Sequence, residues 1–394
     1  MIQIRDKEQC CGCTACYSVC PVSCISMECD KEGFSYPKVD RERCISCGEC
    51  ENVCPVSNEI EGCTTNKAYA VQNKNPQILF HRASGGAFSA PAMAIINRGG
   101  VIFGAAYAND MSVHHMSIDR TDEIHIFRSS KYVQSSLDDS SRKVKITLDT
   151  GKQVCFSGTP CQIAGLKAYL KRDYKNLLTV DVVCKGVASP EVLRQYVKLM
   201  QEKYKSKITS MNFKRKTYGY HSSTMSVDFE NGKTYSAGRI TDLMMRSFTS
   251  GICFRPSCVT CAFKGIERNS DLTLFDCWHY SDLTGKVDDN RGHTSVVVNT
   301  DKGCDMLMMC QEYLDIDPIS LGDAVKLDGR MVCHRTTKHE KGDSFFDILI
   351  KDGLTNAVNE CLHISVRERL TEKLKPILFR LGILELIKEK IKQR

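Results

Sequence analysis

Residues 154–187, VCFSGTPCQIAGLKAYLKRDYKNLLTVDVVCKGV, contain a strand–helix–strand pattern. Residues 154–156 predict a short apolar strand, 158–160 a turn, 162–171 a helix and 177–183 a second apolar strand. A helix that connects two short apolar strands is typical of a βαβ unit, in which the two strands run parallel. The stretch therefore predicts an α/β domain with parallel strands at its centre.

Two cysteines follow the two predicted strands. Cys161 comes just after the first strand, at the start of the helix, and Cys184 directly follows the second strand. Because parallel strands end at the same edge of a sheet, where ligands of open α/β sheets bind, we expect the two thiols to lie close together. The helix N-terminus also favours the thiolate form of Cys161. A buried, inert role is the alternative for either thiol alone, and the matched positions favour a shared site.

A third segment supplies a pair of closely spaced thiols. Residues 251–261, GICFRPSCVTC, contain Cys258 and Cys261 as a C-x2-C pair, which Cys253 extends to C-x4-C-x2-C. Such a pair provides half of a tetrahedral metal site or half of the ligands of a 4Fe-4S cluster. Two more thiolates are needed, and Cys161 and Cys184 are the natural candidates, with Cys253 as a substitute. A zinc site is the alternative.

The first sixty residues contain a cysteine run that occurs twice. Each copy has the spacing C-x2-C-x2-C-x3-C-P, as in bacterial ferredoxins that hold two 4Fe-4S clusters. The copies are Cys10, Cys13, Cys16 and Cys20 before Pro21, and Cys44, Cys47, Cys50 and Cys54 before Pro55. In such runs the fourth thiolate binds the cluster of the other copy. The predicted ligand sets are therefore Cys10, Cys13, Cys16 with Cys54, and Cys44, Cys47, Cys50 with Cys20.

The segment between the two runs predicts a hairpin that bridges them. Residues 24–44 alternate in character on either side of a turn at Gly33. Zinc prefers two separated C-x2-C pairs, so the duplicated run argues against it. Four cysteines of the N-terminal region are interpreted as bystanders: Cys11, Cys24, Cys29 and Cys63.

Composition limits the classes of function. The chain has 394 residues, 23 cysteines and a formal net charge of +7. Its Lys and Arg residues are scattered except in the C-terminal tail, which argues against nucleic-acid binding. The sequence shows neither a signal peptide nor an apolar run of the ~18–20 residues that span a bilayer. We therefore expect a cytoplasmic protein, where clustered thiols serve as metal ligands or redox groups.

A glycine-rich turn is the candidate site for a cofactor phosphate. Residues 68–73 and 101–107 predict strands, and Ser84, Gly85 and Gly86 precede a helix between them. The backbone N–H groups of such a turn, together with the helix dipole, suit an anion such as a diphosphate. Close packing of the helix on the sheet explains the small residues equally well, and both interpretations stay open.

The order of these motifs resembles the coenzyme F420 hydrogenase/dehydrogenase beta-subunit family, and in particular its bacterial members with an N-terminal dicluster ferredoxin domain. The resemblance spans about residues 8–335 and rests on SGG, SKYVQS, FSGTPCQIAGLKAYL, VDVVCKGV, RPSCVTC and SDLTLFDCW. It implies FAD and a 4Fe-4S cluster in the catalytic domain. The cluster ligands implied by the resemblance are Cys161, Cys184, Cys258 and Cys261. The residues implied to lie by the flavin are Ser84, Gly85, Gly86 and Lys131.

These observations predict an α+β chain with a βαβ-containing α/β catalytic domain and a ferredoxin fold before it. The expected units are a ferredoxin domain over 1–62, two parts of the oxidoreductase domain over 66–150 and 151–340, and a basic helical tail over 341–394. In the tail, Pro376 and Gly382 predict a break into shorter helices. The tail suits a membrane surface or a docking partner, and packing back on its own domain is an equally good alternative, so all three interpretations stay open.

The predicted function is that of an iron–sulfur flavoprotein oxidoreductase. It would move electrons between a two-electron carrier or organic substrate and one-electron carriers, through flavin and 4Fe-4S clusters. Expected partners are an external carrier, such as ferredoxin or a deazaflavin, and a separate catalytic protein. The alternative is an electron-transfer subunit without a substrate pocket of its own.

Overall fold

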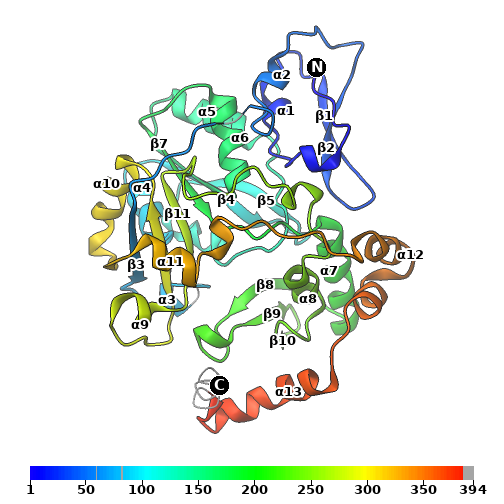
Figure 1. The fold of residues 1–394 in the computed structure, drawn as a ribbon, viewed down its shortest axis with the longest axis vertical. Helices are drawn as coiled ribbons and strands as arrows, with labels where there is room; N and C mark the ends of the chain where they lie inside the picture. The colour runs from blue at the N-terminus through cyan, green and yellow to red at the C-terminus, as the bar shows by residue number, and fades with distance from the viewer. Residues whose placement is uncertain (59, 81–82, 385–394) are drawn as a thin grey trace.

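An eight-stranded mixed sheet forms the centre of the molecule (Figure 1). The computed structural model describes residues 1–58, 60–80 and 83–384. The strand order in the sheet is β13-β3-β12-β11-β7-β6-β4-β5. In that order the strands are Leu314–Ile319, Lys67–Asn73, His293–Val298, Leu272–Cys277, Leu177–Val182, Val154–Gly158, Val101–Tyr107 and Val113–Ile118.

The middle of this sheet is parallel, as the strand–helix–strand pattern predicted. Strand β6 pairs in parallel with β4 and β7, and β7 pairs in parallel with β11, whereas the outer pairs are antiparallel. Helix α6 (Pro160–Leu170) connects β6 to β7. The helix begins two residues earlier than expected, because Thr159 and Gln162 form a capping box and a proline occupies the first turn.

Helices cover both faces of the sheet. Helices α4 (Ser89–Ile96) and α10 (Asp301–Met309) pack in one apolar cluster with the sheet, and α5 (Ser140–Asp149) and α6 pack in another. Helix α4 begins at Ser89, so the Ser84–Gly86 turn lies further from the helix than the sequence suggested. Shorter helices at the sheet margins are α3 (Pro76–Phe80), α9 (Tyr280–Thr284) and α11 (Leu321–Leu327).

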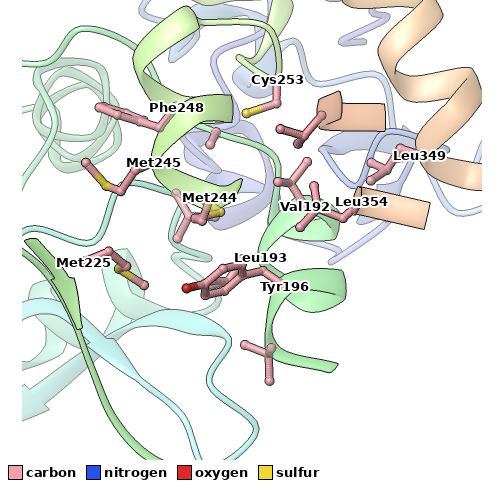
Figure 2. Packing of buried hydrophobic residues seen from close by; sticks show 14 of the residues in the cluster. Val192, Leu193, Tyr196, Met225, Met244, Met245, Phe248, Cys253, Leu349 and Leu354 are labelled. Carbon is pink, nitrogen blue, oxygen red and sulfur yellow. The ribbon is translucent and has the colours of Figure 1, made fainter. Parts of the chain in front are cut away.

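A smaller antiparallel sheet and three helices form a second apolar core. Its strands, in the order β10-β9-β8, are Thr234–Ala237, Thr224–Phe229 and Ile208–Arg215. Its helices are α7 (Pro190–Tyr204), α8 (Leu243–Ser250) and α12 (Gly342–Cys361). Figure 2 shows Leu193 of α7, Met244 of α8 and Leu354 of α12 in this core, with Cys253 at its margin.

The N-terminal residues form a compact module at one end of the molecule (Figure 1). Strands β1 (Ile25–Cys29) and β2 (Ser35–Val39) pair antiparallel, which confirms the predicted hairpin. The module also contains α1 (Ala15–Val19) and α2 (Glu49–Asn52). Gly33 has a φ of 85°, and a Cβ added there would lie 2.7 Å from Glu191, so the turn needs glycine to pack against α7.

The C-terminal tail continues from α12, which is kinked at Gly353, into α13 (Val366–Arg380). The prediction that Pro376 breaks the tail is wrong, because α13 runs through this residue. A proline there removes one backbone hydrogen bond, and the capping box at Ser365 and Glu368 supports the start of the helix. No helix among the described residues is both long and apolar enough to cross a membrane. The last ten residues of the predicted tail, 385–394, lie outside the described residues.

The remaining short elements are 3-10 turns: η1 (Lys7–Gln9), η2 (Thr121–Phe127), η3 (Tyr220–Ser222), η4 (Pro256–Cys258), η5 (Cys310–Glu312) and η6 (Arg330–Val332).

Candidate functional site

Four cysteines from three segments line one small cavity at the carboxyl edge of the parallel strands. Cys161 lies in the first turn of α6, and Cys184 lies two residues beyond β7. Cys258 and Cys261 reach the same cavity, of about 50 Å³, from η4 and the loop after it. Cys253 instead is fully buried in the second apolar core and does not line the cavity. The fold thus brings together the four thiols that the resemblance implied.

Burial makes these thiols hard to ionise by themselves. It raises the pKa of Cys258 to about 12, and burial together with the neighbouring thiols raises the pKa of Cys184 and Cys261. The pKa of Cys161 is also raised well above its usual value, by a hydrogen bond with Cys11 and by burial. The expected stabilisation of a Cys161 thiolate by the helix N-terminus is therefore outweighed. A centre that carries positive charge would be needed to hold four thiolates here.

Cationic side chains surround the same cavity. Lys264 donates hydrogen bonds to the carbonyl oxygens of Cys184, at 2.5 Å, and Met331, at 2.7 Å. Arg268 is 3% exposed and donates through Nη1 to the Phe263 carbonyl at 2.8 Å. The Nε of Arg268 has no hydrogen-bond partner among the described residues, although it is buried. These groups suit a site whose bound group carries net negative charge.

The eight cysteines of the duplicated run divide between two further cavities. The fourth cysteine of each run lies with the first three of the other run. One cavity is lined by Cys10, Cys13, Cys16 and Cys54, and the other by Cys20, Cys44, Cys47 and Cys50. This grouping arises because α1 lies within the first run and α2 within the second, and the two short helices pack together.

Two cysteines interpreted as bystanders lie at these cavities. Cys11 lines both the cavity of the first run and the cavity of Cys161. Cys24 lines the cavity of the second run, and its Sγ is 3.4 Å from the Sγ of Cys20. One signal in the sequence pointed to Cys11: the second run has Ile45 at the equivalent position, so the two copies are not identical there.

A buried arginine joins the ferredoxin module to the rest of the chain. The guanidinium of Arg255 donates to the Cys10 carbonyl at 2.7 Å, to the Ser35 carbonyl at 2.9 Å and to Gln134 Oε1 at 2.9 Å. It also lies 3.6 Å from Cys10 Sγ and 4.3 Å from the ring centroid of Tyr36. Arg255 is 1% exposed and lines the Cys161 cavity. Sequence reasoning placed it only among scattered basic residues.

A much larger cavity, of about 480 Å³, opens beside the Cys161 cavity. Ser84, Gly86 and Lys131 all line it, as the resemblance implied. Two buried hydroxyls on its wall, Ser89 Oγ and Ser129 Oγ, have no hydrogen-bond partner within the described part of the chain. Unpartnered buried hydroxyls suit a polar cofactor with phosphate and hydroxyl groups.

Gly85 does not line this cavity. A Cβ at this position would lie 2.4 Å from the Val71 carbonyl oxygen and 2.7 Å from the Thr294 nitrogen. Its N–H donates to Thr294 Oγ1 at 2.9 Å. Close packing against the sheet therefore explains Gly85, whereas Ser84 and Gly86 face the cavity.

The large cavity and the Cys161 cavity share a wall. The segment 184–187 lines both of them. Gly186 is needed in this wall, because a Cβ there would lie 2.4 Å from the ring of Phe254. Lys185 lines both cavities, and burial lowers its pKa.

Hydrogen bonds and burial fix the protonation of His115, and an ion pair joins Lys214 to Asp276, at the large cavity. Burial lowers the pKa of His115 to about 4, so its ring is neutral at pH 7. Because Nε2 lies 3.0 Å from the Ser157 carbonyl, Nε2 is the donor, and Nδ1 accepts from Ser135 at 3.0 Å. Lys214 and Asp276 form a partly buried ion pair of 2.5 Å at the cavity margin, where Asp276 lines the cavity.

Two family models match parts of this chain. Residues 151–321 match the family model for the C-terminal region of the beta subunit of coenzyme F420 hydrogenase/dehydrogenase, and residues 9–58 match that of the 4Fe-4S dicluster domain. A chain of the F420-reducing NiFe hydrogenase complex from Methanosarcina barkeri, from a study of its xenon derivatization, is similar at 16% identity and a TM-score of 0.47. That similarity covers 69% of this chain and 89% of the other. No curated protein gives a significant match.

Proposed function

Because residues 151–321 match the family model for the C-terminal region of the coenzyme F420 hydrogenase/dehydrogenase beta subunit and residues 9–58 match that of the 4Fe-4S dicluster domain, we propose that the chain is an iron–sulfur flavoprotein oxidoreductase. It moves electrons between a two-electron carrier or organic substrate and one-electron carriers. The observation that carries this proposal is the succession of cavities. Cys11 lines both the cavity of Cys10, Cys13, Cys16 and Cys54 and the Cys161 cavity. The segment 184–187 lines both the Cys161 cavity and the large cavity.

The residues that would hold the clusters follow from the three cysteine-lined cavities. The proposed ligand sets are Cys10, Cys13, Cys16 and Cys54; Cys20, Cys44, Cys47 and Cys50; and Cys161, Cys184, Cys258 and Cys261. A 4Fe-4S cluster, when bound, takes up or releases one electron at a time. Around the third set, Arg255, Lys264 and Arg268 offset the negative charge of the thiolates.

The large cavity is the proposed site of the flavin, which when bound exchanges a hydride on one side and single electrons on the other. Ser89 and Ser129 would donate to its polar groups, and Ser84 and Gly86 would line the same wall. Neutral His115 is fixed by the Ser157 carbonyl, so it does not add a proton to the cavity at neutral pH. Lys214 and Asp276 compensate each other, so the pair places a dipole rather than a net charge at the margin.

Purified chain should test the function as a whole. Anaerobically isolated protein is expected to contain flavin and iron–sulfur clusters and to reduce a small substrate, or to oxidise a reduced deazaflavin, with an artificial one-electron carrier. A preparation with full iron content that releases neither FAD nor FMN would contradict the flavoprotein proposal. The chain would then be an electron relay for a separate catalytic partner.

Removing the unpartnered hydroxyls of the large cavity should weaken flavin binding. Ser89→Ala combined with Ser129→Ala is expected to raise the Kd for FAD by about tenfold or more, because each lost hydrogen bond is worth roughly 1 kcal/mol. Fluorescence titration of deflavinated protein measures this Kd. Ser141→Ala is the matched control, since Ser141 Oγ is also buried without a hydrogen-bond partner in the described structure but lies outside the cavity. An equal effect of the control would refute the assignment of the site.

Crosswise ligation in the ferredoxin module predicts which variants should resemble each other. Cys20→Ser is expected to give the same loss of EPR signal as Cys47→Ser, because both thiols line one cavity. Cys54→Ser is expected instead to match Cys13→Ser. Cys24→Ser is the control for Cys20 and should keep both signals. If Cys20→Ser matches Cys13→Ser, each run binds its own cluster and the crosswise sets are wrong.

A further inference from the structure

Helix α13 carries an exposed apolar face that the rest of the described chain leaves uncovered. No residue of this helix is buried. Leu370, Leu374 and Ile377 are 55%, 50% and 54% exposed, and Val366 and Leu381 are more exposed still. At 3.6 residues per turn, the four helical positions fall on one face of α13, and Leu381, the first residue after the helix, continues that face. The part of the chain that the structure describes therefore leaves this face of α13 without an apolar partner.

The opposite side of α13 faces the body of the protein. Phe379 packs on Tyr218 with ring centroids 5.2 Å apart. Glu372 has a side chain only 6% exposed, lies against Gly238 and pairs with Lys375. These contacts fix the rotation of the helix about its own axis, so the apolar face points outward.

Basic residues border the apolar face of α13, whereas its glutamates lie on the opposite side. Arg369, Lys373 and Arg380 follow one edge of the apolar face and Arg367 the other, as helical spacing requires. Both glutamates of the helix, Glu368 and Glu372, fall on the opposite side. Residues 366–394 as a whole contain nine Lys or Arg and four Glu. The outward side is thus apolar along its centre and cationic along both edges.

We propose that α13 lies on an anionic phospholipid surface, with its apolar face in the hydrocarbon boundary and its basic edges among the headgroup phosphates. An apolar face between cationic edges matches a bilayer interface, in which anionic phosphates surround the inserted helix on every side. A protein groove would have to combine an apolar floor with two acidic rims to match the same pattern. The ferredoxin module lies at the opposite end of the long axis (Figure 1), so a membrane-bound molecule leaves it accessible to a soluble carrier.

Vesicle sedimentation of the full chain tests this proposal. The protein is expected to bind vesicles of phosphatidylcholine with phosphatidylglycerol at least about tenfold more tightly than vesicles of phosphatidylcholine alone, because the anionic surface attracts each basic residue near it. Leu374→Glu with Ile377→Glu should weaken binding by about tenfold or more per residue, because each change removes a large apolar side chain from the hydrocarbon boundary. Arg369→Glu with Lys373→Glu should weaken it by about fivefold per charge, on anionic vesicles only.

Ile146→Glu on α5 is the matched control, because Ile146 is another exposed apolar residue, 66% exposed, at the other end of the molecule in Figure 1. It should bind vesicles like the unaltered chain. Absence of binding to anionic vesicles, or equal loss in the Ile146 variant, would overturn the proposal. A dimer in gel filtration that Leu374→Glu dissociates, without vesicle binding, would assign the face to a second copy of the chain instead.

Discussion

Cys161→Ser and Cys258→Ser are each expected to remove one 4Fe-4S cluster from the full chain, lowering its iron content from about twelve to about eight per molecule. Both thiols line the small cavity at the sheet edge, and a cluster held by three segments closes only when all four thiolates are present. Iron and sulfide analysis of anaerobically purified variants measures the loss. The signals of the two ferredoxin clusters should persist, since their cavities contain neither residue.

Cys253→Ala is the matched control for this prediction. Cys253 is the first cysteine of the same C-x4-C-x2-C segment, yet it is fully buried in the second apolar core. Its replacement should therefore leave the iron content unchanged. If Cys253→Ala removes the cluster and Cys184→Ser keeps it, the ligand set is wrong. If the cavity yields one zinc and no sulfide, the site is structural and electrons do not pass through it.

Arg255→Met is expected to lower the free energy of unfolding by about 3 kcal/mol and to shift the reduction potential of the Cys10 cluster to a more negative value. The loss of stability follows because the buried carbonyls of Cys10 and Ser35 lose their donor. The potential falls because an N–H group near Cys10 Sγ, at 3.6 Å, stabilises the more negative, reduced state of the cluster. Denaturant unfolding and an EPR-monitored redox titration measure the two effects.

Arg268→Met separates this effect from a general loss of positive charge. Arg268 is also buried and lines the same cavity, but its guanidinium donates to the Phe263 carbonyl rather than to the ferredoxin module. Its replacement should shift the potential of the third cluster and leave that of the Cys10 cluster in place. If both variants shift the reduction potential of the Cys10 cluster equally, Arg255 acts only through its long-range charge.

Local spacing was sufficient to predict the main elements of the fold. The βαβ unit is present because short apolar strands flank a helix that begins at a capping box, and each of these signals lies within a few residues. The hairpin around Gly33 formed for a similar reason. The prediction from sequence failed at Pro376. The rule that proline ends a helix did not account for the ten helical residues that precede this proline.

The amino-acid sequence alone was enough to predict three local features: two ferredoxin runs, a βαβ unit with a thiol after each strand, and a C-x2-C pair that complements these thiols. These features depend on residues that are near one another along the chain. The packing of the elements placed Cys253 in an apolar core, Cys11 at two cavities, Arg255 against the Cys10 carbonyl, and the apolar face of α13 outward. Arg255 and Cys10 are 245 residues apart. The packing of whole elements fixes such a contact, so no spacing in the sequence encodes it.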